Sequence, residues 1–106
     1  MAFDDIWRLG ASANLAVASA AGAAVSTAVF GSQTYAVMVN FPGSTSSTHG
    51  VRIKIGTVGE APVADTTSPL IFGCMNNVFK VTPGQRLSAI SNDAGTPTLT
   101  IVQLTK

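Results

Sequence analysis

The chain has 106 residues, with six Lys and Arg against five Asp and Glu, so its formal net charge is +1. This length predicts one domain, and six basic residues neutralise too few phosphates for nucleic-acid binding. An apolar content of 46% excludes a disordered chain, and a lone cysteine excludes an internal disulfide or a cysteine-based metal site.

The first nine residues differ in composition from the rest of the chain, because they mix apolar and acidic side chains and hold the only tryptophan. Two interpretations remain open: a terminus folded back on its own core, or an arm that reaches a neighbouring subunit. We expect residues 1–10 to form an N-terminal arm and residues 11–106 to form the domain. A buried tryptophan is a common interface anchor, so the candidate interface residues are Phe3, Ile6 and Trp7.

The long stretch without charge raises the question of a membrane span. Between Arg8 and Arg52 no residue carries a full charge if the histidine is neutral. The richest window, residues 10–30, is mostly Ala, Gly, Ser and Thr, whereas a spanning helix needs about 20 predominantly strongly apolar residues. We therefore expect no membrane span. Asp4 and Asp5 stand where an export signal carries basic residues, so we expect synthesis and folding in a cytoplasm.

The first part of the domain predicts strands. The alanine content of residues 11–30 suits a helix, but no stripe of large apolar residues runs through it at helical spacing. Alternating Leu and Val favour strands near 13–19 and 24–30, joined around Gly22, with a helix as the alternative. The next strand, 33–41, is apolar on both faces, so we expect it to be central in a sheet or to lie in an interface.

The second part of the chain has clearer strand signals. A loop of Pro, Gly and hydroxyl residues at 42–50 precedes a run in which Val51, Ile53 and Ile55 alternate with polar or small residues. The apolar phase shift within the last strand predicts a bulge or burial on both faces. Further strands and turns are expected near 62–66 (a short edge strand), 70–72, 78–81, 82–85 (a type II turn), 86–91, 92–95 (a turn) and 98–105.

The density of strands predicts the fold class. About eight short strands separated by regular turn signals are typical of a β-sandwich or barrel. No internal repeat and no second domain is evident in the sequence.

Residues able to carry chemistry are few and scattered. His49, Cys74 and Asp65 have no partner nearby in sequence that suits metal binding, nucleophilic catalysis or a calcium loop. We therefore predict no enzyme activity, no catalytic residue, no metal site and no cofactor. A small basic group has two interpretations, a solvated strand face or a contact with an acidic partner: Arg52, Lys54 and Arg86.

Charge density gives the positive indication of function. Charged residues make up 10% of the chain, against about 25% in a typical soluble domain. A surface of small and hydroxyl side chains either stays soluble through its hydroxyl groups or is covered by neighbouring subunits. The two apolar faces of the strand at 33–41 and the arm with Trp7 favour the second alternative, a surface covered by neighbouring subunits. An oligomer of this kind is expected to have closed symmetry.

Two sequence runs carry a resemblance to a known family. VRIKIGTVGEAPVADTTSPLI and VFKVTPGQRLSAISNDAGTPTLTIVQL, with the Ala/Ser/Asn-rich opening ASANLAVA, resemble small virion proteins of tailed bacteriophages. The shared pattern is a strand ending in Gly-Thr, a Pro/Ala/Thr stretch, a phenylalanine strand, a Pro-Gly turn and a final Thr/Val/Leu strand. It covers residues 11–105.

The resemblance implies both fold and function. The expected fold is an all-β, single β-sandwich or jelly-roll-like domain of about eight short antiparallel strands with a short N-terminal arm. The expected function is capsid decoration (cement): binding to the major capsid protein on the outer capsid surface of the virion, as a homo-oligomer, expected to be a trimer, that stabilises the shell. The alternatives are a head–tail or tail/fibre component and a carbohydrate- or receptor-binding β-sandwich module.

Overall fold

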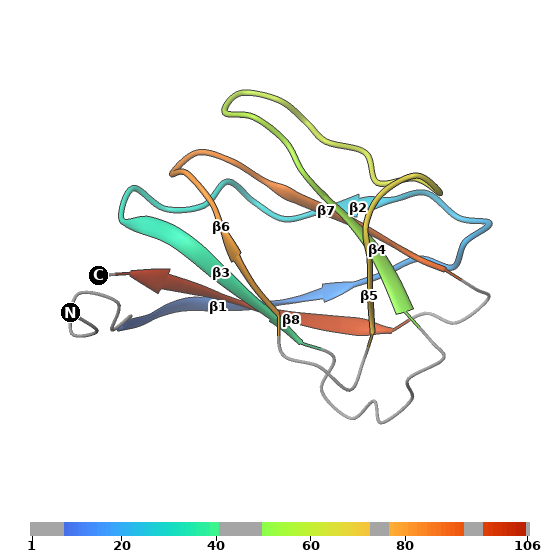
Figure 1. The fold of residues 1–106 in the computed structure, drawn as a ribbon, viewed down its shortest axis with the longest axis horizontal. Helices are drawn as coiled ribbons and strands as arrows, with labels where there is room; N and C mark the ends of the chain where they lie inside the picture. The colour runs from blue at the N-terminus through green and yellow to red at the C-terminus, as the bar shows by residue number, and fades with distance from the viewer. Residues whose placement is uncertain (1–7, 41–49, 73–76, 93–96, 106) are drawn as a thin grey trace.

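The computed structural model describes residues 8–40, 50–72, 77–92 and 97–105, and within them it contains eight strands and no helix (Figure 1). All pairings are antiparallel. The expectation of an all-β sandwich of short strands is confirmed. The strands are β1 (Arg8–Ala16), β2 (Val25–Ser26), β3 (Thr34–Asn40), β4 (Gly50–Ile55), β5 (Leu70–Phe72), β6 (Asn77–Lys80), β7 (Leu87–Ser91) and β8 (Thr98–Thr105).

The strands form two four-stranded sheets with a nested pairing. Sheet A has the order β1-β8-β3-β6, and sheet B has the order β2-β7-β4-β5. The first strand therefore pairs with the last, the second with the seventh, the third with the sixth, and β4 with β5. This is one long hairpin rolled up so that its paired strands alternate between two sheets, which is the jelly roll.

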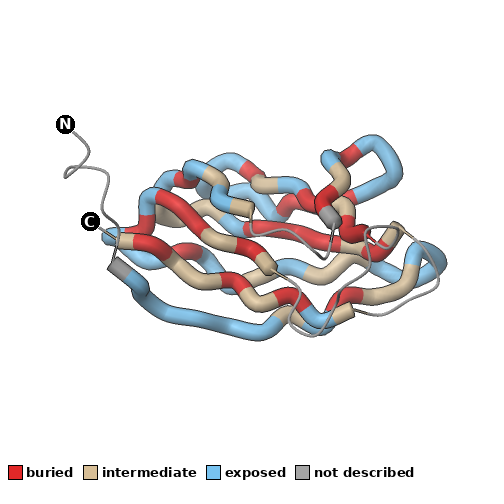
Figure 2. The backbone as a smooth tube through the Cα atoms, turned by 60° about the horizontal axis from the view of Figure 1, so that its bottom comes forward, coloured by how far each residue is buried: buried red, intermediate tan, exposed pale blue. Residues whose placement is uncertain are grey.

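The core lies between the two sheets. Strand residues alternate between the core and the outside, and Figure 2 shows buried and more exposed positions following one another along several strands. Sheet A and sheet B contribute apolar side chains that are at most 3% exposed: Val37, Val39, Leu99 and Ile101 from sheet A, and Val51, Ile53, Leu87 and Ala89 from sheet B. The alternation expected for the strand at 51–56 is thus the inner row of β4.

The region 11–30 is extended, but its strands differ in extent from the two that were expected. In place of 13–19 the strand begins earlier, at Arg8, and in place of 24–30 only two residues form β2. The chain after β2 still runs along β7, because the Thr27 N–H donates to the Leu87 carbonyl at 2.9 Å. The Thr27 hydroxyl accepts the Leu87 N–H at 3.1 Å in place of a backbone carbonyl. Because a side-chain hydroxyl replaces the backbone acceptor, the regular hydrogen-bond ladder between β2 and β7 ends early.

The prediction of a short edge strand at 62–66 is wrong. This segment forms no strand and lies over the outer face of sheet B, where the Ala64 N–H donates to the Ser88 hydroxyl at 3.0 Å. The Ser26 hydroxyl donates to the Pro62 carbonyl at 3.3 Å. Serine side chains from β2 and β7 thus take the place of a strand partner.

The remaining expectations concern turns and the terminus. The turn at 82–85 is confirmed as type II, with Gly84 at φ +91° and the Gln85 N–H donating to the Thr82 carbonyl at 3.1 Å. Of the expected arm, residues 1–7 lie outside the described residues, and its last three residues begin β1. Of the expected loop at 42–50, only Gly50 is described, and it begins β4.

Candidate functional site

Most of the residues singled out for chemistry or contact lie outside the described part of the chain. This holds for His49 and Cys74, and for the candidate interface residues Phe3, Ile6 and Trp7. Among the described residues, no three His, Cys, Asp or Glu side chains gather as they would around a metal ion. The same residues contain no helix long and apolar enough to cross a membrane.

Asp65 has a structural role in the loop between β4 and β5. Its carboxylate accepts the Thr67 hydroxyl at 2.6 Å and the Thr67 backbone N–H at 2.8 Å. These hydrogen bonds, that from the Thr67 hydroxyl first, lower the pKa of Asp65 below its ordinary value. The ionised carboxylate therefore stabilises a local turn rather than holding a proton for transfer.

The outer face of sheet A carries apolar residues on all four strands, which we call the outer patch. One row of register partners crosses all four strands, from Ser12 through Val102 and Met38 to Val78. The neighbouring row runs from Leu9 through Leu104 and Ala36 to Lys80, and Lys80 is the one charged residue of the two rows. The outer patch consists of Leu9, Ala36, Met38, Val78, Val102 and Leu104.

The outer patch explains two features of the sequence. The expectation that the strand at 33–41 is central is confirmed, because β3 lies between β8 and β6. Its second apolar face is the middle of the outer patch. The phase shift in β8 reflects burial on both faces, with Ile101 in the core and Leu104 buried on the outer side. The rim is open to solvent, since Leu9 is 75% and Val78 is 57% exposed.

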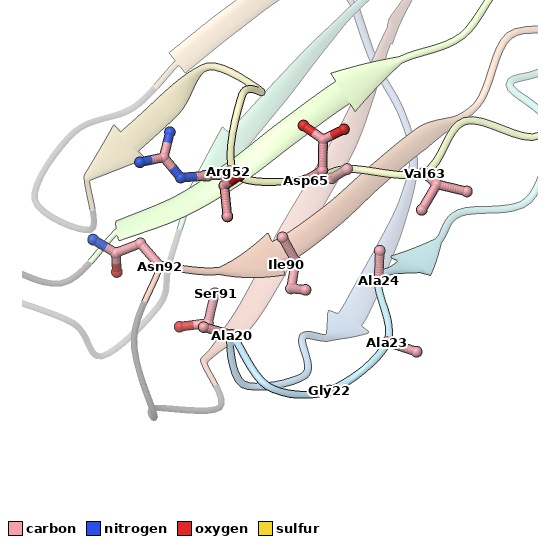
Figure 3. Close-up of a pocket in the computed structure, with 12 residues that line it drawn as sticks. Ala20, Gly22, Ala23, Ala24, Arg52, Val63, Asp65, Ile90, Ser91 and Asn92 are labelled. Atoms are coloured by element: carbon pink, nitrogen blue, oxygen red, sulfur yellow. The ribbon is translucent and has the colours of Figure 1, made fainter.

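The outer face of sheet B carries a pocket of about 640 Å³ (Figure 3). Its sides are the segment 63–66, held by Ser88 as described above, and the connection between β1 and β2. Strands β4 and β7 contribute Arg52 and Ile90, which are register partners. Figure 3 shows Arg52 and Asn92 at one end, and Val63 and Ala24 at the other. The pocket thus has a polar end and an apolar end.

Two charged residues line this pocket in the part of the chain that the structure describes, Arg52 and Asp65. The Asp65 carboxylate accepts hydrogen bonds from Thr67, whereas Arg52 has unused binding capacity. Its Nη1 donates to the Ser68 carbonyl at 3.0 Å, and it makes no ion pair with any described residue. The side chain is half-buried, whereas Lys54 and Arg86 are exposed. A guanidinium has five N–H donors, so several remain for a ligand.

Comparison with known proteins gives this chain no relative: no family model, no curated protein and no solved structure matches it. Its function therefore has to be inferred from the jelly roll, the outer patch on sheet A and the pocket on sheet B. The two surfaces lie on opposite outer faces of the sandwich, so one copy can contact two different neighbours.

Proposed function

We propose that the chain is a virion structural protein, a capsid decoration (cement) protein that binds the outer surface of a shell of major capsid protein as a trimer. The observation that carries this proposal is the outer patch. An apolar surface that extends over all four strands of a small sheet marks an interaction site rather than a solvated face. Leu9 and Val78 are exposed and Met38 and Val102 are half-buried, so these four residues can contact a shell subunit, whereas Ala36 and Leu104 are buried.

The fold and the composition support the same proposal. Jelly rolls serve as viral capsid proteins and as lectins, so the fold by itself leaves both classes open. A charged fraction of 10% suits a protein covered by neighbours. A sugar site requires an exposed aromatic ring beside polar groups, and the described lining of the pocket on sheet B contains no aromatic side chain. The pattern resemblance of residues 11–105 to small virion proteins adds to the decoration assignment.

The physical action of such a protein follows from linkage. A ligand that binds only the assembled shell stabilises that state by an amount set by its concentration and its dissociation constant. Many copies on one shell act together through multivalency, so that a weak single contact still reinforces the whole particle. No bond is made or broken, and the protein needs no cofactor.

Replacing Val78 by aspartate is expected to weaken shell binding by about 2 kcal/mol or more, because an unpaired carboxylate would be buried at the contact. Val78 is 57% exposed in the free chain, so the variant is expected to fold. The measurement uses particles prepared from a strain in which the gene has been deleted, so that the shells lack this protein. Purified chain is added back, and the amount that sediments with the shells is titrated.

Val58→Asp is the matched control for Val78→Asp. Val58 is 61% exposed and lies outside the outer patch, in the connection between β4 and β5. We expect this variant to bind shells as the parent does. If Val78→Asp also binds like the parent, the outer patch is not the shell contact. If the parent itself does not sediment with the shells, the decoration assignment is wrong.

A further inference from the structure

The pocket on sheet B defines the chemistry of its occupant. Its polar end presents the half-buried guanidinium of Arg52, which has no carboxylate partner among the described residues. Its other end is lined by small and aliphatic groups, among them Val63 and Ala24. A planar guanidinium binds a carboxylate through paired hydrogen bonds. The pocket therefore fits a segment with a carboxylate directly next to apolar side chains.

The chain itself contains such a segment at its N-terminus. Residues 1–7 read MAFDDIW, in which Asp4 and Asp5 are flanked by Phe3, Ile6 and Trp7. Asp4 and Asp5 are the only two adjacent acidic residues in the sequence. The carboxylates of this segment are complementary to the Arg52 end of the pocket, and its apolar side chains to the Val63 and Ala24 end. Asp65, the other charged residue of the described lining, already accepts hydrogen bonds from Thr67.

The segment cannot reach the pocket of its own copy. It joins the domain at Arg8, and β1 then runs nine residues away from that point, about 27 Å at ~3.3 Å per residue. The pocket lies beyond the far end of β1, where the Ser91 N–H donates to the Ala18 carbonyl at 3.0 Å. Fully extended, the chain from Arg8 back to Asp4 spans only about 14 Å. A segment of residues 1–7 bound in this pocket therefore comes from a second copy.

We propose that the pocket on sheet B binds residues 1–7 of a neighbouring copy, with Arg52 pairing with the Asp4–Asp5 carboxylates. The arm leaves one end of the sandwich and the pocket lies at the other, so the contact is head-to-tail. A head-to-tail contact closes into a ring when the rotation permits, and a ring of three uses every arm and every pocket. This inference deepens the proposed function and rests on it only for the number of copies in the ring.

The only tryptophan of the chain gives a direct readout, because Trp7 lies in the arm. Four proteins are compared over a dilution series: the parent, Arg52→Glu, Arg52→Glu combined with Asp4→Lys and Asp5→Lys, and Arg86→Glu. The last makes the same charge change at an exposed residue outside the pocket. Trp7 emission reports the environment of the arm, and light scattering reports the mass. The unfolding midpoint of each variant is measured by circular dichroism.

The parent and Arg86→Glu are expected to approach about 32 kDa, three times the 10.8 kDa of one chain, with Trp7 emission at shorter wavelength than in the monomer. Arg52→Glu is expected to associate at least tenfold more weakly, because it places like charges together. The triple variant restores the opposite charges and is expected to recover the mass and the emission, which a folding defect could not do.

The proposal is overturned if Arg52→Glu keeps the mass and the emission of the parent, or if the triple variant fails to recover at an unchanged unfolding midpoint. These outcomes are separate from those of shell binding. If the parent associates through its arm but does not bind shells, the decoration proposal is wrong and the arm contact stands. If the parent binds shells and Arg52→Glu associates like the parent, the arm contact is wrong and the decoration proposal stands.

Discussion

Replacing Leu87 by alanine is expected to lower the free energy of unfolding by about 2–5 kcal/mol. Leu87 lies on β7, is 0% exposed and belongs to the core cluster between the two sheets. Its removal leaves a cavity lined by residues of both sheets, which the pairing of β7 with β4 and β2 prevents from closing. Total stabilities of small domains are about 5–15 kcal/mol, so the loss is a large share. Urea unfolding followed by circular dichroism measures it.

Leu9→Ala is the matched control, since it deletes the same atoms from a residue that is 75% exposed. We expect its effect on the free energy of unfolding to stay within about 0.5 kcal/mol. If both variants lost the same free energy of unfolding, Leu87 would not lie in the interior of the sandwich. The Leu9 variant also tests the edge of the outer patch, because it can be titrated on shells alongside Val78→Asp.

Gly50→Ala is expected to cost about 1–3 kcal/mol, the usual range for overpacking. A Cβ at Gly50 would lie 2.7 Å from the Ile71 carbonyl oxygen and 2.8 Å from Leu70 Cδ1. The carbonyl belongs to β5, which pairs directly with β4, so it cannot retreat without loosening that pairing. The Gly50 N–H also donates to Asn92 Oδ1 at 3.0 Å, so the strain extends to the polar end of the pocket.

Gly31→Ala controls for the loss of a glycine. A Cβ there would meet its nearest atoms at 3.5 and 3.6 Å, which is ordinary contact. We expect a change within about 0.5 kcal/mol, with a small gain from a stiffer unfolded chain. Unfolding midpoints in urea give both values. A Gly50 variant as stable as the parent would show that β5 does not approach β4 as closely as described.

Local patterns in the sequence were enough to find most strands. The strands expected at 70–72, 78–81, 86–91 and 98–105 agree with β5 to β8 within one residue at each end. The turn at Pro83 and Gly84 was predictable because its two residue types are fixed by backbone geometry. Strand order was not predictable, because β1 and β8 lie at opposite ends of the chain and nothing in either strand specifies the other.

The two candidate surfaces differ in how far the sequence predicted them. The outer patch was indicated by a strand with two apolar faces, since a central strand of an antiparallel sheet normally has one. The pocket was missed, because the segment at 62–66 was assigned as a strand. Its position depends on Ser26 and Ser88, outward hydroxyls on neighbouring strands. Without the pairing of β2 with β7, two serines 62 residues apart in sequence carry no signal.

The most direct test of the proposed function is to locate the protein on intact particles. An antibody raised against the purified chain is applied to particles banded from a lysate of cells that carry the gene, and gold label is counted by electron microscopy. The decoration assignment predicts label spread over the outside of the shell, with none on particles from the deletion strain. Label confined to the head–tail junction or the tail, or particles without label, would contradict it.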